Sequence, residues 1–202
     1  MMNRRSMLLA LAGLAIAGQA VAQGAPSRRI RGVITGLEGR NLLIRTREGE
    51  SVTVLLADNV TVVALRRLEL SEVRPGSFIG TAAEPDGDGG WRALEVLVFP
   101  EAMRGTGEGH FAWDLTPSSS MTNANVTAAV DGTNGRELVL HPRGQEIRVR
   151  VPADAPVVTF IPAALEDLKP GAQVFLSAAP NAGGQLSAAR ITVARDGVVP
   201  PM

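Results

Sequence analysis

Apolar and polar residues alternate in short runs along most of the chain. Residues 146–151 read Glu-Ile-Arg-Val-Arg-Val, a strict alternation that predicts a β-strand with one buried and one solvated face. Further short runs, rich in β-branched residues and separated by glycine or proline turns, predict more strands. The expected strands cover residues 30–34, 42–46, 51–56, 60–63, 78–83, 92–99, 126–130, 137–140, 146–151, 157–160, 173–178 and 188–194. The pattern therefore predicts an all-β protein.

Two short segments with helical spacing interrupt the strands. They are residues 68–73 in the first half and residues 163–168 in the second. A Pro-Gly pair follows each of them, at Pro75-Gly76 and at Pro170-Gly171. Such a pair ends a helix because proline cannot continue its hydrogen bonding and glycine allows a sharp exit. We therefore expect one short helical turn in each half.

The chain also matches itself. Residues 36–42 (GLEGRNL) match residues 132–138 (GTNGREL) at an offset of 96. After a single-residue gap, residues 73–76 (VRPG) match residues 168–171 (LKPG) at an offset of 95. Ordered matches of this kind predict an internal duplication.

Each copy has the element order of a small closed barrel, for which the OB-fold is the nearest familiar case. We therefore expect an all-β chain of two tandem small OB-like β-barrels, each with one short helical turn. The first barrel is expected over residues 28–100 and the second over residues 126–196, with a linker over 101–125 and a tail over 197–202. Two small open β-sandwich halves are the alternative architecture.

The first 22 residues have the organisation of a secretory signal peptide. Two arginines precede an apolar run over residues 7–17, and Ala20-Val21-Ala22 forms a small-x-small cleavage site. The run is too short to cross a bilayer, which needs about 20 apolar residues. We therefore expect residues 1–22 to be removed, leaving a periplasmic or secreted protein with no transmembrane segment. Residues 3–8 (NRRSML) also resemble a twin-arginine signal, so general secretory and twin-arginine export both stay open.

Charge and composition argue against several classes of function. The chain has 20 basic and 20 acidic residues, and loss of Arg4 and Arg5 leaves 18 against 20, a net charge of −2. A near-neutral protein lacks the basic surface that nucleic acid requires. Five Phe, two Trp and no Tyr supply few rings for stacking on bases. The absence of Cys removes disulfides, thiolate metal sites and a cysteine nucleophile. We expect no nucleic-acid partner.

Residues 103–125 have no counterpart in either copy, so a specialised site is expected there. His110, one of two histidines, lies next to Glu108 and near Trp113 and Asp114. Imidazole and carboxylate groups bind divalent metals or hold a polar ligand, and an indole forms a flat wall. The candidate ligand-binding residues are Arg104, Glu108, His110, Trp113 and Asp114. If a metal binds, its expected ligands are Glu108, His110 and Asp114, with Glu101 close by.

The same segment also fits a structural role. Phe111, Trp113 and Leu115 alternate as a strand or plug that packs between the barrels. The charged residues around them would then form ordinary ion pairs at its rim. One histidine with scattered carboxylates lacks the repeated ligand spacing that identifies a zinc site. No cofactor is expected.

Two segments carry a resemblance to a known family. Residues 165–174 (LEDLKPGAQV) resemble the loop-to-strand signature of an uncharacterised family of bacterial exported OB-like domains, described only as domains of unknown function. Residues 99–110 (FPEAMRGTGEGH) are similar to the central segment of that family's two-domain proteobacterial members. The resemblance covers nearly all of the mature chain. It implies fold and compartment, and it implies no reaction and no catalytic residues.

The sequence holds no recognisable pair of nucleophile and base, so we expect a protein that is not an enzyme, and a hydrolase ranks third. The leading hypothesis is a periplasmic binding or scaffold protein built from duplicated β-barrels. Its expected partner is an envelope protein, a glycan or a small polar ligand. The alternative is a metal-binding accessory protein of the cell envelope that uses the His110 segment.

Overall fold

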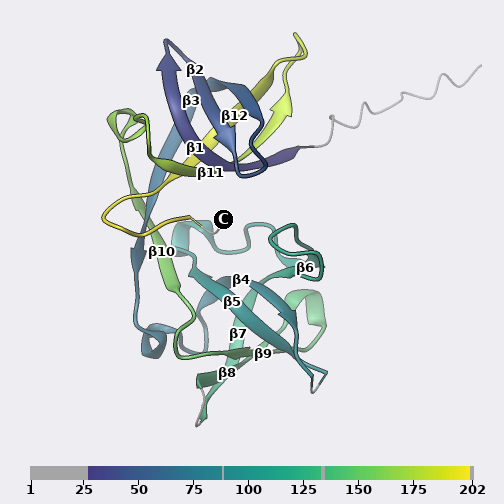
Figure 1. Ribbon diagram of the computed structural model, residues 1–202. Helices are drawn as coiled ribbons and strands as arrows, with labels where there is room; N and C mark the ends of the chain where they lie inside the picture. Colours follow the sequence, from purple (N-terminus) through teal and green to yellow (C-terminus); the bar gives the residue numbers. More distant parts are fainter. Residues whose placement is uncertain (1–26, 88, 133–134, 201–202) are drawn as a thin grey trace, which may run out of the picture.

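The computed structural model describes residues 27–87, 89–132 and 135–200, which form an all-β structure, as predicted (Figure 1). The strands in this part of the chain are β1 (Arg28–Glu38), β2 (Asn41–Thr46), β3 (Ser51–Arg67), β4 (Phe78–Pro85), β5 (Trp91–Val98), β6 (Gly109–Ala112), β7 (Ser120–Gly132), β8 (Gly135–Leu140), β9 (Ile147–Val151), β10 (Val157–Pro162), β11 (Gln173–Pro180) and β12 (Leu186–Val193). The helical elements are single 3-10 turns, η1 (Leu70–Glu72), η2 (Glu101–Met103), η3 (Pro142–Gly144) and η4 (Leu165–Asp167). The predicted signal peptide lies outside the described residues.

Five strands form a closed barrel, which we call the upper lobe after its place in Figure 1. β1 pairs with β2 and β11, and β2 pairs with the first part of β3. β12 closes the ring because it pairs with β11 on one side and runs parallel to β3 on the other. Closure leaves no free edge on any of the five strands. The barrel thus combines strands from both ends of the chain.

The barrel interior is filled by the inward-facing residues of alternating strand positions. Ile30 and Ile34 of β1, Leu42 of β2, Leu176 of β11 and Ile191 of β12 are almost fully buried in one cluster. Each side chain of this size contributes about 1.5–3 kcal/mol of hydrophobic stabilisation when fully buried. The upper lobe therefore depends on residues separated by more than half of the chain.

A second group of strands, the lower lobe, has the same order of pairings. β4 pairs with β5 and β7, β7 pairs with β8, and β8 pairs with β9. β9 runs parallel to β5 through two residue pairs, Trp91 with Val149 and Arg92 with Arg150. Buried side chains such as Ile79, Leu138 and Val149 make a separate core.

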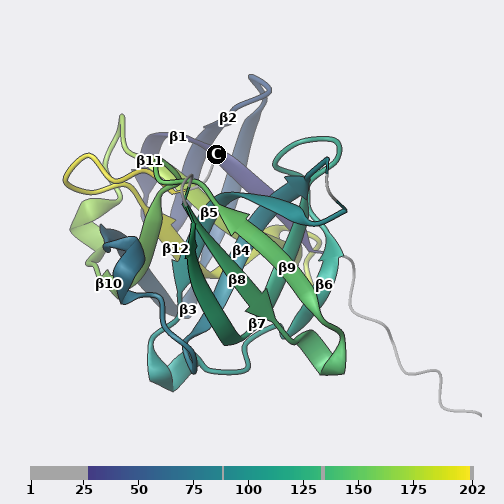
Figure 2. The ribbon, with the colours of Figure 1, turned by 90° about the horizontal axis from the view of Figure 1, so that it is seen from below.

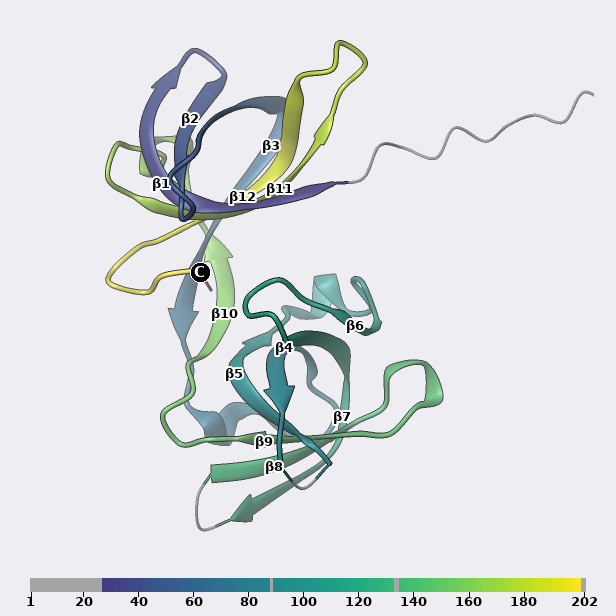
Figure 3. The same cartoon turned by 45° about the vertical axis from the view of Figure 1, so that its right-hand side comes forward.

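Two long segments connect the lobes (Figure 3). The end of β3 leaves the upper lobe and pairs antiparallel with β10, which leads back from the lower lobe. β10 also runs parallel to β5 through Val158 and Leu97. The view in Figure 2 shows β10 at the side of the molecule, next to the strands of both lobes. Two hydrogen-bonded strands therefore hold the lobes together.

The strand pairings differ from the predicted division at residues 28–100 and 126–196. β1, β2 and β3 lie within residues 28–100, whereas their barrel partners β11 and β12 lie within residues 126–196. The linker expected over 101–125 contains η2, β6 and the first part of β7. β7 begins at Ser120, earlier than the strand predicted from residue 126, because Met121, Thr122 and their neighbours pair with both β4 and β6. Small polar residues gave no apolar pattern by which to predict that extension.

The expectation that no transmembrane segment is present can be compared with the helices of the structure. Within the described ranges, no helix has the length and apolar character needed to traverse a bilayer.

Candidate functional site

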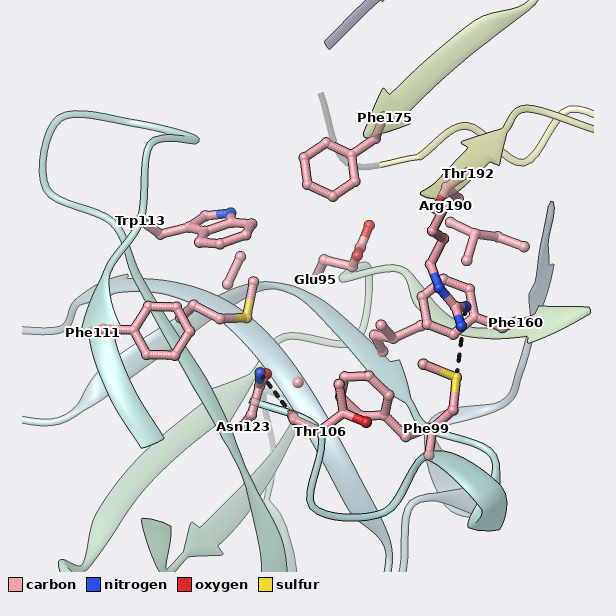
Figure 4. Close-up of a pocket in the computed structure, with 16 residues that line it drawn as sticks. Glu95, Phe99, Thr106, Phe111, Trp113, Asn123, Phe160, Phe175, Arg190 and Thr192 are labelled. Atoms are coloured by element: carbon pink, nitrogen blue, oxygen red, sulfur yellow. Dashed lines mark hydrogen bonds between the residues drawn. The ribbon is translucent and has the colours of Figure 1, made fainter. Parts of the chain in front are cut away.

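A cavity of about 250 Å³ lies between the lobes (Figure 4). Phe175 of β11 and Arg190 of β12 reach it from the upper lobe. Gly80 of β4, Glu95 of β5 and Asn123 of β7 reach it from the lower lobe. Further lining residues come from the connecting strands and from the loop around β6, namely Leu65, Phe99, Met103, Thr106, Phe111, Trp113 and Phe160.

Strand alternation explains why these side chains face the cavity. Val174 and Leu176 point into the upper barrel, so Phe175 between them points outward. In the same way, Ile191 is buried in the barrel core and its neighbour Arg190 points outward. The cavity is therefore enclosed by the outer surfaces of the two lobes, and the hydrophobic core of neither lobe contributes to it.

Aromatic rings dominate the cavity wall. Four of the five phenylalanines of the chain and one of its two tryptophans line it. Trp113 lies 6.2 Å from Phe111 and 6.2 Å from Phe175, between ring centroids. Phe99 lies 6.1 Å from Phe160 on the opposite side. In a protein with so few rings, their concentration at one surface indicates a site that holds an apolar or flat group.

Glu95 places a carboxyl group in this apolar setting. Glu95 is only 9% exposed, and within the described residues its side chain has no hydrogen-bond or ion-pair partner. Burial raises the pKa of Glu95 to about 8, because desolvation disfavours the charged carboxylate. Figure 4 shows the carboxyl group pointing into the space between Trp113, Phe175 and Arg190. An acid held this way is protonated at neutral pH unless a ligand supplies a partner.

Two further polar groups at the cavity lack partners. The Asn123 Nδ2 donates to the carbonyl oxygens of Gly107 at 3.1 Å and Thr106 at 3.4 Å, which fixes the orientation of the amide. Among the described residues, the Asn123 Oδ1 and the Trp113 Nε1 are then buried without a hydrogen-bond partner. Buried polar groups without hydrogen bonds are rare in native proteins. Both atoms belong to residues that line one cavity.

Two arginines fix the position of Trp113. The Arg29 guanidinium lies 4.0 Å from the Trp113 ring centroid, and that of Arg31 lies 4.8 Å from the Phe175 ring centroid. Asp114 lies 2.8 Å from Arg31 and 3.7 Å from Arg29. Burial raises the pKa of Asp114, but the hydrogen bond from Arg31 and the charges of Arg31 and Arg29 outweigh it, and the net shift is downward. This cluster attaches the β6 loop to the upper lobe.

The sequence-predicted site residues have separate surroundings. Trp113 lines the cavity, and Asp114 next to it in the chain forms an ion pair with Arg31. The His110 Nδ1 lies 2.8 Å from the hydroxyl of Thr122, and partial burial lowers the pKa of His110. Its ring packs on Trp91, with a centroid distance of 4.9 Å.

The remaining two predicted residues bind neighbouring chain segments. Glu108 accepts a hydrogen bond from the backbone N–H of Arg143 at 3.3 Å. Arg104 donates to both carboxylate oxygens of Glu101 and to the Asn125 side chain. Of the five predicted residues, therefore, only Trp113 lines the cavity.

The metal hypothesis finds no cluster to support it. Across the described ranges, no three or more His, Asp or Glu side chains gather as a metal-binding group. His110 lies against Trp91 and Thr122, neither of which supplies a carboxylate.

Sequence reasoning missed Glu95, Asn123 and Phe175. One signal for Glu95 was available, because it is the one charged residue within the apolar run of residues 93–99. For Phe175 and Asn123 the sequence offered none, since their role depends on which strands lie on facing surfaces of the two lobes.

Comparisons with known proteins return no match: no family model, no curated protein and no solved structure resembles the chain significantly.

Gly80 forms the part of the cavity wall next to Asn123, and alanine there is expected to destabilise the protein. An added Cβ would lie 2.6 Å from the Asn123 Oδ1 and 3.1 Å from the Phe99 ring. Overpacking of this kind costs about 1–3 kcal/mol. Urea unfolding of Gly80→Ala measures the change. Gly87→Ala is the control, because nothing lies within 4 Å of a Cβ added at that loop position. Equal stability of the two variants would contradict the tight contact.

Proposed function

We propose that this protein is a non-enzymatic binding protein that holds a small, largely apolar ligand between its two lobes. One observation carries the proposal: the interlobe cavity combines aromatic walls with buried polar groups that have no hydrogen-bond partner among the described residues. Binding is favoured over catalysis because the polar groups of Glu95, Asn123 and Trp113 are not coupled to each other by hydrogen bonds. The proposed ligand differs from the polar molecule that the linker residues suggested.

We further propose that the two lobes are duplicated OB-like barrels that have exchanged their last two strands. β4 and β5 precede β11 and β12 by 95 residues, with equal lengths, which is the offset of the sequence match. The ring order β1-β2-β3-β12-β11 has the same pattern as β7-β8-β9-β5-β4. Each ring then takes three strands from one copy and two from the other. The cavity lies between surfaces that this exchange holds face to face.

The compartment remains the cell envelope in this proposal. The arginine pair, apolar run and Ala-x-Ala site of residues 1–22 favour export to the periplasm or beyond. A small apolar ligand, an envelope protein or a glycan are all available there, and the dimensions of the cavity favour the small ligand.

A neutral single-ring probe tests the binding function. We expect 3-phenyl-1-propanol to bind the purified protein with one-to-one stoichiometry in isothermal titration calorimetry. Phe175→Ala removes one wall of the cavity and is expected to weaken binding by about tenfold, since burial and ring packing are both lost. Leu165→Ala is the control, because Leu165 is an exposed residue of η4. Absence of binding, or equal affinity for Phe175→Ala and the unmodified protein, would exclude the cavity as the ligand site.

A further inference from the structure

The ligand class follows from the groups that face the cavity. Resting on the proposed binding function, we propose that the natural ligand is a small apolar or aromatic amine whose positively charged nitrogen binds the Glu95 carboxylate. Glu95 is more than nine-tenths buried, lines the cavity and points into it (Figure 4). A cation placed there would give the carboxylate the partner that the described residues do not supply.

The hydrogen-bonding groups that line the cavity favour an amine as the ligand. The carboxylate of Glu95 and the Oδ1 of Asn123 are both acceptors, and neither has a donor within the described residues. An ammonium group has three N–H donors and no acceptor, so it complements both. The rings of Trp113, Phe175 and Phe99 add attraction for a cation over their faces. The Nε1–H of Trp113 is a donor, so it does not bind the ammonium group.

The other charges around Glu95 fit the same ligand. Arg190 is exposed, lies 5.7 Å from the Phe160 ring and contacts the Sδ of Met103 at 3.8 Å. Within the described residues it makes no ion pair with Glu95. Arg29 and Arg31 lie against Trp113 and Phe175 and share Asp114 as their counter-ion.

The strands packed against β5 supply no competing partner. Glu84 of β4 pairs with Arg92 at 3.2 Å, and Arg150 of β9 pairs with Asp86 at 2.8 Å. On β10, Thr159 donates its hydroxyl to the carbonyl oxygen of Val98. Glu95 is therefore the negative group left for a ligand in this region.

Cavity volume limits the size of the amine. About 250 Å³ is below the 300–1,000 Å³ typical of sites for drug-sized molecules. We therefore expect one ring or one short branched chain beside the charged nitrogen.

Three probes that differ only in their polar end test the inference. They are 3-phenylpropylamine, 3-phenyl-1-propanol and 3-phenylpropanoate, titrated calorimetrically into the full mature protein at pH 8. We expect the amine to bind at least about tenfold more tightly than the alcohol, because a charge-assisted contact is formed only with the amine. Glu95→Gln should reduce the affinity for the amine to about that for the alcohol, because the charge-assisted contact is lost.

A proton balance provides a second readout without any substitution. With a pKa of about 8, Glu95 is mostly protonated at pH 7, so binding of the amine should release close to one proton per molecule. Titrations in two buffers with different heats of ionisation measure that release, and the alcohol should release none. Arg190→Ala should keep or increase affinity for the amine, since it removes a nearby cation.

The outcomes separate this inference from the function on which it rests. Equal affinity for amine and alcohol, without proton release, overturns the amine proposal and leaves the binding function intact. Tightest binding of 3-phenylpropanoate, abolished by Arg190→Ala, overturns it in favour of an anionic ligand. Absence of binding for all three probes overturns both.

Discussion

Replacing Glu95 with glutamine is expected to stabilise the protein by roughly 4 kcal/mol at pH 8 and to change little at pH 4.5. The ordinary pKa of this carboxyl is 4.5, and burial raises it to about 8 in the folded protein. Between these values the folded state binds more protons than the unfolded state. Stability is therefore fully present below pH 4.5 and is lost as the pH rises toward 8. Glutamine has nearly the same shape and carries no charge, so it removes that loss.

Urea unfolding at several values between pH 5 and pH 8 measures this effect. The unmodified protein should lose stability across the range, whereas Glu95→Gln should show a nearly flat profile. Glu166→Gln is the matched control, because Glu166 is exposed in η4. A pH dependence of the same slope in Glu95→Gln and the unmodified protein would mean that Glu95 is solvated or paired.

Separated halves of the chain are expected to be unfolded, although the sequence match predicts one copy in each half. A fragment of residues 27–105 holds β1, β2 and β3 but lacks β11 and β12, which close the upper barrel. It would expose the apolar side chains of Ile30, Ile34 and Leu42 that the complete barrel buries. A fragment of residues 106–200 lacks β4 and β5 and has the same defect.

Circular dichroism and amide proton NMR measure this directly. Each fragment alone should give the spectra of an unfolded chain, and an equimolar mixture should regain the β-sheet signal. A full chain cleaved within the exposed loop at Gly105 is the control, since all strands remain present. If the fragment of residues 27–105 folds alone, its own strands suffice to form a barrel, as expected from the sequence. That result would exclude the strand exchange.

Most individual elements could be predicted from the sequence. The alternation over residues 146–151 identifies β9, and the helical spacing over 163–168 identifies the region of η4. Local patterns of this kind depend on the few residues that form the element. The strands expected at 51–56 and 60–63 proved to be one strand, β3, in which Ala57, Asp58 and Asn59 between them lie in a bulge where the register against β12 shifts from Leu56 to Thr61.

Strand partnership could not be predicted in the same way. The sequence predicts two copies with the same pattern of inward-facing residues, so periodicity does not decide whether β5 or β12 pairs with β3. The distinction lies in the path of the chain after Leu65, where β3 continues beside β10 instead of folding back into its own barrel. Periodicity contains no information about that path.

The candidate site shows the same limit. Trp113, a candidate residue from segment 103–125, lines the cavity. The sequence suggested His110, Glu108 and Arg104 because residues with ionisable side chains lie close together there. In the structure each of them binds a different neighbour. Glu95 and Phe175 lie 80 residues apart in sequence and reach one cavity only after both lobes have formed.

The pairing of β1 with β11 also sets the order of events during biosynthesis. Arg28 faces Ala178 in this ladder, so the earliest of the described strands waits for one of the last of them. Contacts of such long sequence separation form slowly, because the chain must close a very large loop before they contribute. The strands of the lower lobe lie within residues 78–151 and can pair earlier. Until β11 and β12 are available, β1 and β3 each have an unpaired edge, and exposed strand edges of this kind promote aggregation during folding.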